Sequence, residues 1–365
     1  MKNQTTLRNA FVSILLFLTS SILLSRITEA AVLRSNERPF SQLQPRFVTI
    51  DVPGAVNGSY AQAINGEGVI AGTYVDENFA FHGFVRAQDG SITAFDAPGG
   101  IITQTGGGSL VAPAAINASG AVTGSYFDEN FLSHGFVRAA DGTLTTFDVR
   151  GAVSTNAKAI NPLGVVTGYY YDANNVPHGF VRMPNGRSIA FDAPGAAFGT
   201  QPLGLNVKGA IIGQFFDGNF PAHGFVRAPD GSFVAFDPPG ATYTEPNDIN
   251  AAGMITGSYH DENYVFHGFV RVNGSIITFD VPGAGTGSFQ GTNAAAIDHG
   301  GTVTGYYIDA NGMVHGFIRA RNGAITPFDA PDSTSTLSLA ISTRGLVTGI
   351  FFDSDGVPRA FLRMP

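Results

Sequence analysis

The sequence predicts an all-β fold, a seven-bladed β-propeller of four-stranded antiparallel blades in which the N-terminal strand completes the last blade. Two observations lead to this prediction. A unit of about 45 residues recurs along the chain, as propeller blades do. The two ends of the chain also match, because the first unit is preceded by an extra strand and the last unit lacks its fourth.

The triplet His-Gly-Phe marks most of the repeated units. It begins at His82, His134, His178, His223, His267 and His315, and Arg359-Ala360-Phe361 takes its place in the last unit. Two intervals are longer than the others because of insertions around residues 101–111 and 285–293. The near-constant spacing indicates one structural unit used repeatedly.

Each unit has the same order of short segments. An apolar stretch ends in Ile-Asn or a related pair, a glycine-containing turn leads to a second strand, and an Asp-x-Asn turn precedes His-Gly-Phe-Val-Arg. An Asp-Gly or Asn-Gly turn then leads to a fourth strand ending in Phe-Asp. This alternation of strand-forming residues with turn residues predicts four antiparallel strands. A β-solenoid is the main alternative, but its coils would be shorter.

The repeated region begins with the pattern of a fourth strand that no other strands of a blade precede. Residues 47–55 have the pattern of a fourth strand followed by Pro-Gly-Ala, whereas the sequence stops at Pro365 after a third strand at residues 360–363. We expect the extra strand to fill the missing place, because this removes two exposed sheet edges.

These residues resemble a known family of repeats. The motifs His-Gly-Phe-Val-Arg, Ile-Asn-x-x-Gly and Gly-x-x-x-x-Phe-Asp over residues 46–365 are similar to the bacterial extracellular HAF repeats, named for a His-Ala-Phe triplet. The chain departs from them in having Gly at the centre of six triplets. The resemblance implies export and repetition, and it implies no activity.

The first thirty residues have the pattern of a signal peptide. Lys2 and Arg8 precede an apolar run, and small residues lead to an expected cleavage site after Ala30. The run is short for a membrane span, although an uncleaved anchor is the alternative. We therefore expect a signal peptide at residues 1–30, a linker at 31–45, the propeller at 46–365, and a protein secreted to the periplasm or beyond the cell.

Composition limits the partners and the means of stabilisation. The net charge of −8 becomes more negative once residues 1–30 are removed, which argues against binding to nucleic acid or to an anionic membrane. The chain has no cysteine, so an apolar core rather than disulfides must stabilise the exported fold. We expect a monomer.

The register of the third and fourth strands predicts structural pairs. Blade five has a turn one residue shorter than the others, and both turn lengths fit if glycine of the triplet faces phenylalanine of Phe-Asp. The same count pairs His82 with Asp96, His134 with Asp148, His178 with Asp192, His223 with Asp237, His267 with Asp280, His315 with Asp329, and Arg359 with Asp51. We interpret these as cross-strand pairs; the alternative is a metal site or general bases formed by several histidines.

The Asp-x-Asn turns are candidate calcium ligands, because calcium prefers carboxylate and amide oxygens. The residues are Asp76, Asn78, Asp128, Asn130, Asp172, Asn174, Asp217, Asn219, Asp261, Asn263, Asp309, Asn311, Asp353 and Asp355. A complete EF-hand loop is absent. We favour Asx-turns, in which the aspartate side chain accepts hydrogen bonds from nearby backbone N–H groups.

No catalytic motif or cofactor fingerprint is present, and no cofactor is predicted, with calcium kept as the alternative. In a four-stranded meander, the Asp-x-Asn turns and the connections between blades emerge on one face. This face is acidic, and its loops vary in length. The sequence therefore favours a non-enzymatic binding module that uses this face for a glycan, cell-surface polymer or protein. The alternatives are a propeller lyase or hydrolase with a site in the central funnel, and a calcium-stabilised structural ring.

Residues that break the repeat are the first places to look for a specific site. They are Arg150, Lys158, Lys208, Glu245, His260 and His299. The third-strand arginines recur in every unit, so we interpret them as part of the scaffold. Convergence of His260, His299 and Glu245 at one point would favour an enzyme.

Overall fold

The computed structural model describes residues 45–98, 110–219 and 221–365, and Arg46–Pro365 form one compact unit. The predicted signal peptide, nearly all of the linker and most of the insertion at residues 101–111 lie outside the described residues. The described residues form 28 β-strands, and none of them belongs to a helix capable of crossing a bilayer.

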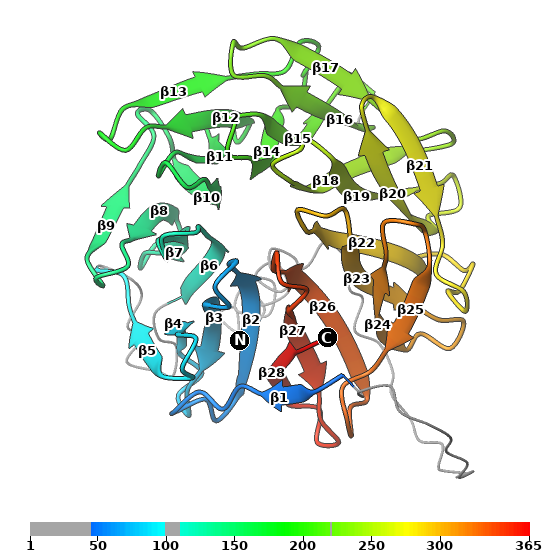
Figure 1. The fold of residues 1–365 in the computed structure, drawn as a ribbon. Helices are drawn as coiled ribbons and strands as arrows, with labels where there is room; N and C mark the ends of the chain where they lie inside the picture. Colours follow the sequence, from blue (N-terminus) through cyan, green and yellow to red (C-terminus); the bar gives the residue numbers. More distant parts are fainter. Residues whose placement is uncertain (1–44, 99–109, 220) are drawn as a thin grey trace, which may run out of the picture. The chain divides into compact units, whose positions relative to one another are not determined.

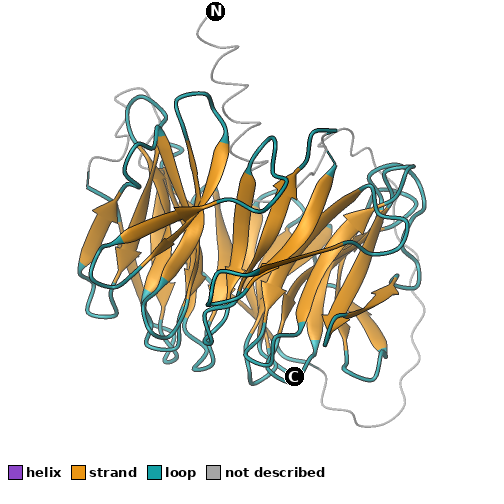
Figure 2. Cartoon of the chain, turned by 90° about the horizontal axis from the view of Figure 1, so that it is seen from above, coloured by secondary structure: helices purple, strands orange, loops and turns teal. Residues whose placement is uncertain are grey.

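The strands form four-stranded sheets in which consecutive strands pair antiparallel, and a single parallel pair of residues joins some of these sheets to the next (Figures 1 and 2). The first sheets along the chain are β2 (Gly58–Ile64), β3 (Ile70–Val75), β4 (Phe81–Arg86) and β5 (Ile92–Phe95); β6 (Leu110–Ile116), β7 (Val122–Phe127), β8 (Ser133–Arg138) and β9 (Leu144–Phe147); and β10 (Ser154–Ile160), β11 (Val166–Tyr171), β12 (Pro177–Arg182) and β13 (Ser188–Phe191). Then follow β14 (Thr200–Leu205), β15 (Ile211–Phe216), β16 (Ala222–Arg227) and β17 (Phe233–Phe236); β18 (Tyr243–Ile249), β19 (Ile255–His260), β20 (Phe266–Val272) and β21 (Ser275–Phe279); and β22 (Gly291–Ile297), β23 (Val303–Ile308), β24 (Val314–Arg319) and β25 (Ile325–Phe328).

The remaining sheet combines strands from both ends of the described chain. β1 (Phe47–Thr49) pairs with β28 (Pro358–Arg363), which pairs with β27 (Val347–Phe352) and then β26 (Ser335–Ile341). Val48 lies opposite Leu362, and the Ile50 N–H donates to the Ala360 carbonyl at 2.8 Å. Residues 47–50 thus take the place of a fourth strand beside β28 (Figure 1).

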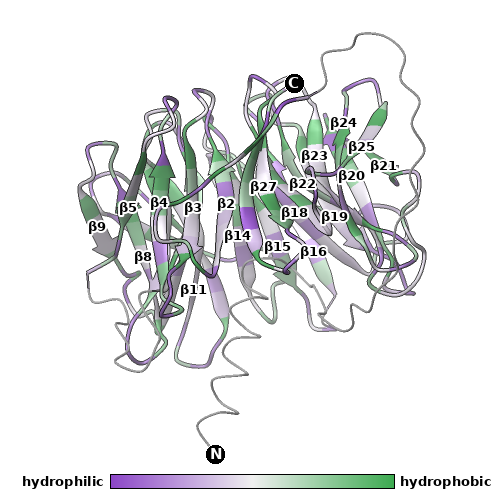
Figure 3. Ribbon diagram, turned by 90° about the horizontal axis from the view of Figure 1, so that it is seen from below, coloured by the Kyte–Doolittle hydropathy of each residue, from purple (hydrophilic) through white to green (hydrophobic). Residues whose placement is uncertain are grey.

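The first strand of each sheet is its innermost strand. β2, β6, β10, β14, β18, β22 and β26 each contact the first strand of the next sheet, and β26 contacts β2. Figure 1 shows the sheets following one another around a common centre. Figure 3 shows apolar residues along many of the strands, which accords with a core built between neighbouring sheets.

Aromatic packing between the sheets explains why Phe-Asp and His-Gly-Phe-Val-Arg recur together. Gly83 lies opposite Phe95, as the turn lengths predict, and a Cβ on this glycine would lie 2.4 Å from the ring. The other side of the Phe95 ring contacts the next sheet, where the Phe136 ring lies 5.8 Å away and the Arg138 guanidinium 5.1 Å away. Burial of such a ring contributes about 1.5–3 kcal/mol, and cation–π contact adds to it.

The same packing recurs around the unit. The triplet phenylalanines are all fully buried, namely Phe84, Phe136, Phe180, Phe225, Phe269, Phe317 and Phe361. Arg138, Arg182, Arg227, Arg271, Arg319 and Arg363 each place the guanidinium 4.5–5.1 Å from a fourth-strand phenylalanine of the preceding sheet. These arginines therefore join neighbouring sheets.

A chain of asparagine side chains also links the sheets. In the Ile-Asn turns, Asn117 Oδ1 accepts from the N–H groups of Ser119 and Ala121, at 3.1 and 2.9 Å. Its Nδ2 donates to the Asn161 carbonyl in the next sheet at 3.0 Å. Equivalent bonds to the next sheet are made by Asn65, Asn161, Asn206 and Asn250, at 2.9–3.5 Å. Each of these buried amides thus holds its own turn and the neighbouring sheet.

We predict that Asn117→Ala lowers the free energy of unfolding by about 2–4 kcal/mol, because buried hydrogen-bonding groups lose their partners. Asn117→Ser should lower the free energy of unfolding by only about 1 kcal/mol relative to wild type. A serine hydroxyl can still accept the hydrogen bonds of the turn, but it cannot reach the next sheet. Ser342 illustrates this, because its Oγ accepts from the N–H groups of Arg344 and Leu346. Denaturant unfolding of the three proteins measures the difference; equal stability of the Ala and Ser variants would contradict the assignment.

We predict that Gly135→Ala costs about 1–3 kcal/mol through overpacking, because the new Cβ would lie 2.5 Å from the Phe147 ring. The sheet containing β1 has Ala360 opposite Ile50 at the equivalent place. Combining Gly135→Ala with Phe147→Ile should therefore cost less than the sum of the two single changes. Gly218→Ala, which meets no atom within 4 Å, is the control. Additive losses in a double-mutant cycle would refute the steric explanation.

Candidate functional site

The two ends of the strands present different groups. We call the end with the Asp-x-Asn turns and the connections between sheets the turn face, and the other end the opposite face; Figure 2 shows loops at both. The turn face carries the carboxylates that the sequence singled out.

Each triplet histidine lies between two carboxylates. His82 Nδ1 lies 2.7 Å from Asp96 Oδ1 in the fourth strand, and His82 Nε2 lies 3.5 Å from Asp76 Oδ2 in the Asp-x-Asn turn. The Nδ1 contacts of the other sheets, at 2.7–3.0 Å, are His134–Asp148, His178–Asp192, His223–Asp237, His267–Asp280 and His315–Asp329. Each ring also packs 4.9–5.3 Å from an aromatic ring of the second strand. The histidines are thus engaged separately, one in each sheet.

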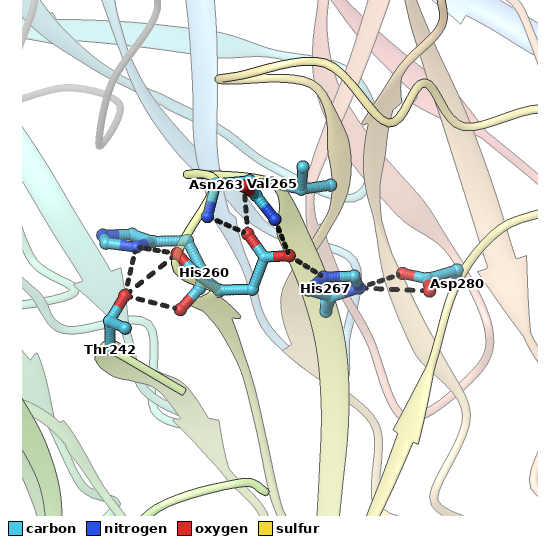
Figure 4. Close-up of polar contacts among 7 residues, drawn as sticks. Thr242, His260, Asn263, Val265, His267 and Asp280 are labelled. Atoms are coloured by element: carbon cyan, nitrogen blue, oxygen red, sulfur yellow. Dashed lines mark hydrogen bonds and ion pairs between the residues drawn. The ribbon is translucent and has the colours of Figure 1, made fainter. Parts of the chain in front are cut away.

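The aspartates of the Asp-x-Asn turns already have partners. Figure 4 shows the turn at Asp261, whose Oδ1 accepts from the N–H groups of Asn263 and Val265 at 2.8 and 3.0 Å. Its Oδ2 lies 3.8 Å from Nε2 of His267, which contacts Asp280 on its other side. This is Asx-turn geometry. Within the described ranges, no group of three or more His, Asp or Glu side chains is arranged to hold a metal ion.

The predicted pair between Arg359 and Asp51 is wrong. Arg359 Nε lies 3.1 Å from Asp353 Oδ2, in the turn of its own sheet. No ion pair joins Arg359 to Asp51, both of which belong to the described residues. The longer arginine side chain bonds to the turn carboxylate directly, whereas histidine in the other sheets bridges two carboxylates.

Two residues that break the repeat lie on innermost strands near the centre. Lys158 is on β10 and Glu245 is on β18, the innermost strands of their sheets, and both are half-buried. Lys158 Nζ lies 5.5 Å from the ring centre of Tyr169, and Tyr169 packs 5.7 Å from Tyr171. Gln214 Nε2 donates to Gln201 Oε1 at 3.0 Å on the sheet between them. The centre therefore holds polar groups that differ from sheet to sheet.

Electrostatic effects place Glu245 among residues of several sheets. Burial lowers the pKa of Lys158, and the carboxylate of Glu245 opposes that change. Burial raises the pKa values of Tyr169, Tyr243 and Tyr306, and Glu245 raises each of them further. Since such effects fall with distance, Glu245 lies within electrostatic range of these four side chains. We call Lys158, Tyr169, Tyr243, Glu245 and Tyr306 the central cluster.

The central cluster continues toward the turn face through aromatic rings. Tyr243 stacks on His260 at 5.0 Å, and His260 lies 5.3 Å from Tyr264. Thr242 Oγ1 lies 3.1 Å from His260 Nδ1 (Figure 4). Burial lowers the pKa of His260. The sequence singled out His260 and Glu245 but missed Tyr243, which lies between them.

The other repeat-breaking residues do not join the central cluster. His299 and Lys208 are exposed in turns of the opposite face, and Arg150 is exposed in a connection of the turn face. His260, His299 and Glu245 therefore do not converge at one point.

A hollow of about 250 Å³ lies on the opposite face between the sheets β10–β13 and β14–β17. Its lining is mainly apolar and includes Leu163, Val165, Leu205 and Pro229, with Lys208 at its edge. It holds no pair of acidic and basic groups, unlike the central cluster.

Comparison with known proteins identifies the fold. No family model and no curated protein matches the chain. Among solved structures, virginiamycin B lyase from Staphylococcus aureus, as a catalytically inactive variant with quinupristin, has a TM-score of 0.59 at 13% identity and covers 88% of this chain and 100% of its own. The β-propeller domain of the Trilobed protease from Pyrococcus furiosus has a TM-score of 0.55 at 12% identity, covering 84% of this chain and 95% of its own.

Arg46–Pro365 form a β-propeller. A streptogramin B lyase structure, with a TM-score of 0.58 at 13% identity, covers 88% of this chain and 98% of its own and supports the same fold. At these identities the likeness concerns the propeller fold alone. The blades of this propeller are the sheets described above.

We predict a raised pKa for His223. Burial lowers this pKa, but contacts with Asp237 and then Asp217 outweigh burial and raise it above the ordinary value of 6.5. Because the folded state holds the proton more tightly, the stabilisation is complete below the unfolded pKa and is lost as pH rises through the folded pKa. An NMR titration of the His223 ring measures this pKa. With Asp237→Asn the pKa should fall, and an unchanged value would contradict the attribution.

Proposed function

We propose that this chain is a secreted seven-bladed propeller of the HAF-repeat type, closed by β1, and that it acts as a non-enzymatic binding module. Its ligand, a glycan, cell-surface polymer or protein, approaches the turn face, and the central cluster holds one of its groups. Export rests on the sequence pattern of residues 1–30, and membership of the HAF repeats on that of residues 46–365.

Closure of the ring is supported by contacts at both ends of the described chain. β1 pairs with β28, and β2 contacts β26, β27 and β28. Where the other sheets pair a glycine with a phenylalanine, β28 and β1 have Ala360 and Ile50. Both members of the pair are therefore changed in the two strands that lie side by side. Pairing in this way leaves no free edge between the first and last blades.

The observation that carries the binding role is the central cluster itself. The repeated histidines, aspartates and arginines are occupied in contacts within or between blades. Lys158 and Glu245 instead break the repeat, and Glu245 lies within electrostatic range of Lys158 and of tyrosines from other blades. A half-buried cation and anion among phenol groups offer paired charges and hydrogen bonds to a ligand.

An enzyme is the second candidate, because the same cluster contains a lysine whose pKa is lowered by burial. Fold neighbours include lyases, but the likeness is to their fold at 13% identity. The separation of His299 from Glu245 and His260 argues for binding over catalysis.

A calcium-stabilised ring is the third candidate, and the occupied oxygens of the Asp-x-Asn turns argue against it. Calcium binding to the folded state alone would raise the melting temperature in a saturable way. Thermal unfolding in EDTA and across a calcium titration therefore separates this candidate from the other two.

We predict that Lys158→Met and Glu245→Gln each weaken binding of the ligand by about tenfold or more. Each change removes one of the two charged groups of the central cluster and leaves the ligand group that it would contact without a partner. Arrays of glycans and peptides identify the ligand with the wild-type protein, and calorimetry compares the variants. Lys208→Met is the matched control, because this lysine is exposed on the opposite face. Unchanged affinity in both cluster variants would refute the central site, and chemical conversion of the ligand seen by mass spectrometry would establish the enzyme instead.

A further inference from the structure

The exposed aromatic side chains of the described residues all lie on the turn face. They are Phe79, Phe131, Phe198, Tyr264 and Phe289, with exposed fractions of 54%, 48%, 40%, 53% and 47%. Single exposed apolar residues are ordinary, but their restriction to one end of the strands is not expected from a surface without a partner. Tyr264 and Phe289 also pack against each other at 5.7 Å.

Three of these residues occupy a backbone position that does not favour them. Phe79, Phe131 and Tyr264 follow the Asp-x-Asn triplet and have φ values of 62°, 60° and 61°. Asn175, Gly312 and Gly356 stand at the same place in other blades and adopt the same left-handed conformation. Because Asn and Gly reach this conformation with less strain, the turn itself does not need an aromatic ring.

An exposed glutamate accompanies each of the three rings. Glu77, Glu129 and Glu262 precede the asparagine of these turns and are exposed. In the turns that have Asn or Gly in place of the ring, the same position is Ala173, Ala310 or Ser354. The ring and the carboxylate thus occur together in three turns, whereas the turn of Asp217 has Phe220 in its sequence with Gly218 in place of the glutamate. In the three turns, the arrangement suits a cation that contacts both groups.

Charge is divided between the two ends of the strands. The acidic residues of the turn face are Asp51, Asp76, Glu77, Asp96, Asp128, Glu129, Asp148, Asp172, Asp192, Asp217, Asp237, Asp261, Glu262, Asp280, Asp309, Asp329, Asp332, Asp353 and Asp355, and the described Lys and Arg residues of this face are Arg150 and Arg359. The opposite face carries Arg46, Arg86, Arg138, Arg182, Arg187, Lys208, Arg227, Arg271, Arg319, Arg321, Arg344 and Arg363, with the fewer acidic residues Glu67, Asp89, Asp141, Asp230 and Asp298. A partner of the turn face must therefore be basic for its charge to be complementary.

We propose that the turn face docks a basic polypeptide segment, with lysine or arginine side chains lying over the rings of Phe79, Phe131 and Tyr264 and paired with the adjacent glutamates. Phenylalanine rings have no hydroxyl to bond to a sugar, and the chain has no tryptophan, so a basic polypeptide fits better than an amino-sugar polymer. This surface borders the central cluster at one point, because the Tyr264 ring lies 5.3 Å from His260, which stacks on Tyr243.

The test uses the full chain and a fluorescent oligolysine peptide, with affinity measured by fluorescence anisotropy at low and physiological salt. Replacing Phe79, Phe131 and Tyr264 together by Asn should weaken binding by about tenfold, because three cation–π contacts are lost. The melting temperature should stay equal or rise, because asparagine fits the left-handed position better. The matched control changes Ile189, Val234 and Ile277 to Asn, which are exposed on outer strands, and should leave affinity unchanged.

A second variant changes Glu77, Glu129 and Glu262 to Gln. It should lower the affinity and reduce its dependence on salt, since it removes charge from the same surface. Lys208→Met, which changes a lysine exposed on the opposite face, should leave oligolysine binding unchanged and so shows that a loss in the other variants is specific to the turn face. Absence of oligolysine binding, wild-type affinity in the aromatic variant, or tighter binding of a chitosan oligomer than of oligolysine would each overturn the proposal.

Discussion

The structure depends first on how one blade packs against the next, through a phenylalanine ring held between a glycine and an arginine. Phe95 can lie flat against its own sheet because Gly83 has no side chain, and its other side then contacts Phe136 and Arg138 of the neighbouring sheet. A larger residue in place of the glycine would displace the ring and so disturb both sheets. The strict repetition of both motifs follows from this shared contact.

This packing also decides where specific chemistry can arise. Residues that build every blade are occupied in doing so, as the contacts of His267 with Asp261 and Asp280 illustrate. The blades differ from one another at positions that this packing does not constrain, namely in the innermost strands and in the turns at one end. Lys158 and Glu245 belong to the first group, and Phe79 belongs to the second.

Sequence reasoning reached the register because a one-residue difference between turns fixed Gly83 opposite Phe95. It did not reach contacts between blades, such as the Asn117 amide bond to Asn161, since these depend on how the sheets stand beside one another. The Arg359 contact was misassigned because side-chain reach was not considered. The exposed ring of Phe79 was overlooked, although Asn175 and Gly312 at the same place in other turns were a readable signal of left-handed backbone.

The asparagine chain has a direction and an end. Asn250 donates to the Asp298 carbonyl, but Asp298 and Ser342 stand where the other turns have asparagine, so neither has an amide to donate onward. Between the turn of Ser342 and the first blade, an exposed ion pair of Arg344 and Glu67 at 2.7 Å joins the sheets instead. Such a pair weakens as salt is added, whereas buried amide bonds do not. Rising ionic strength would therefore weaken the contact between Arg344 and Glu67 and leave the amide bonds between the asparagine-bearing turns intact.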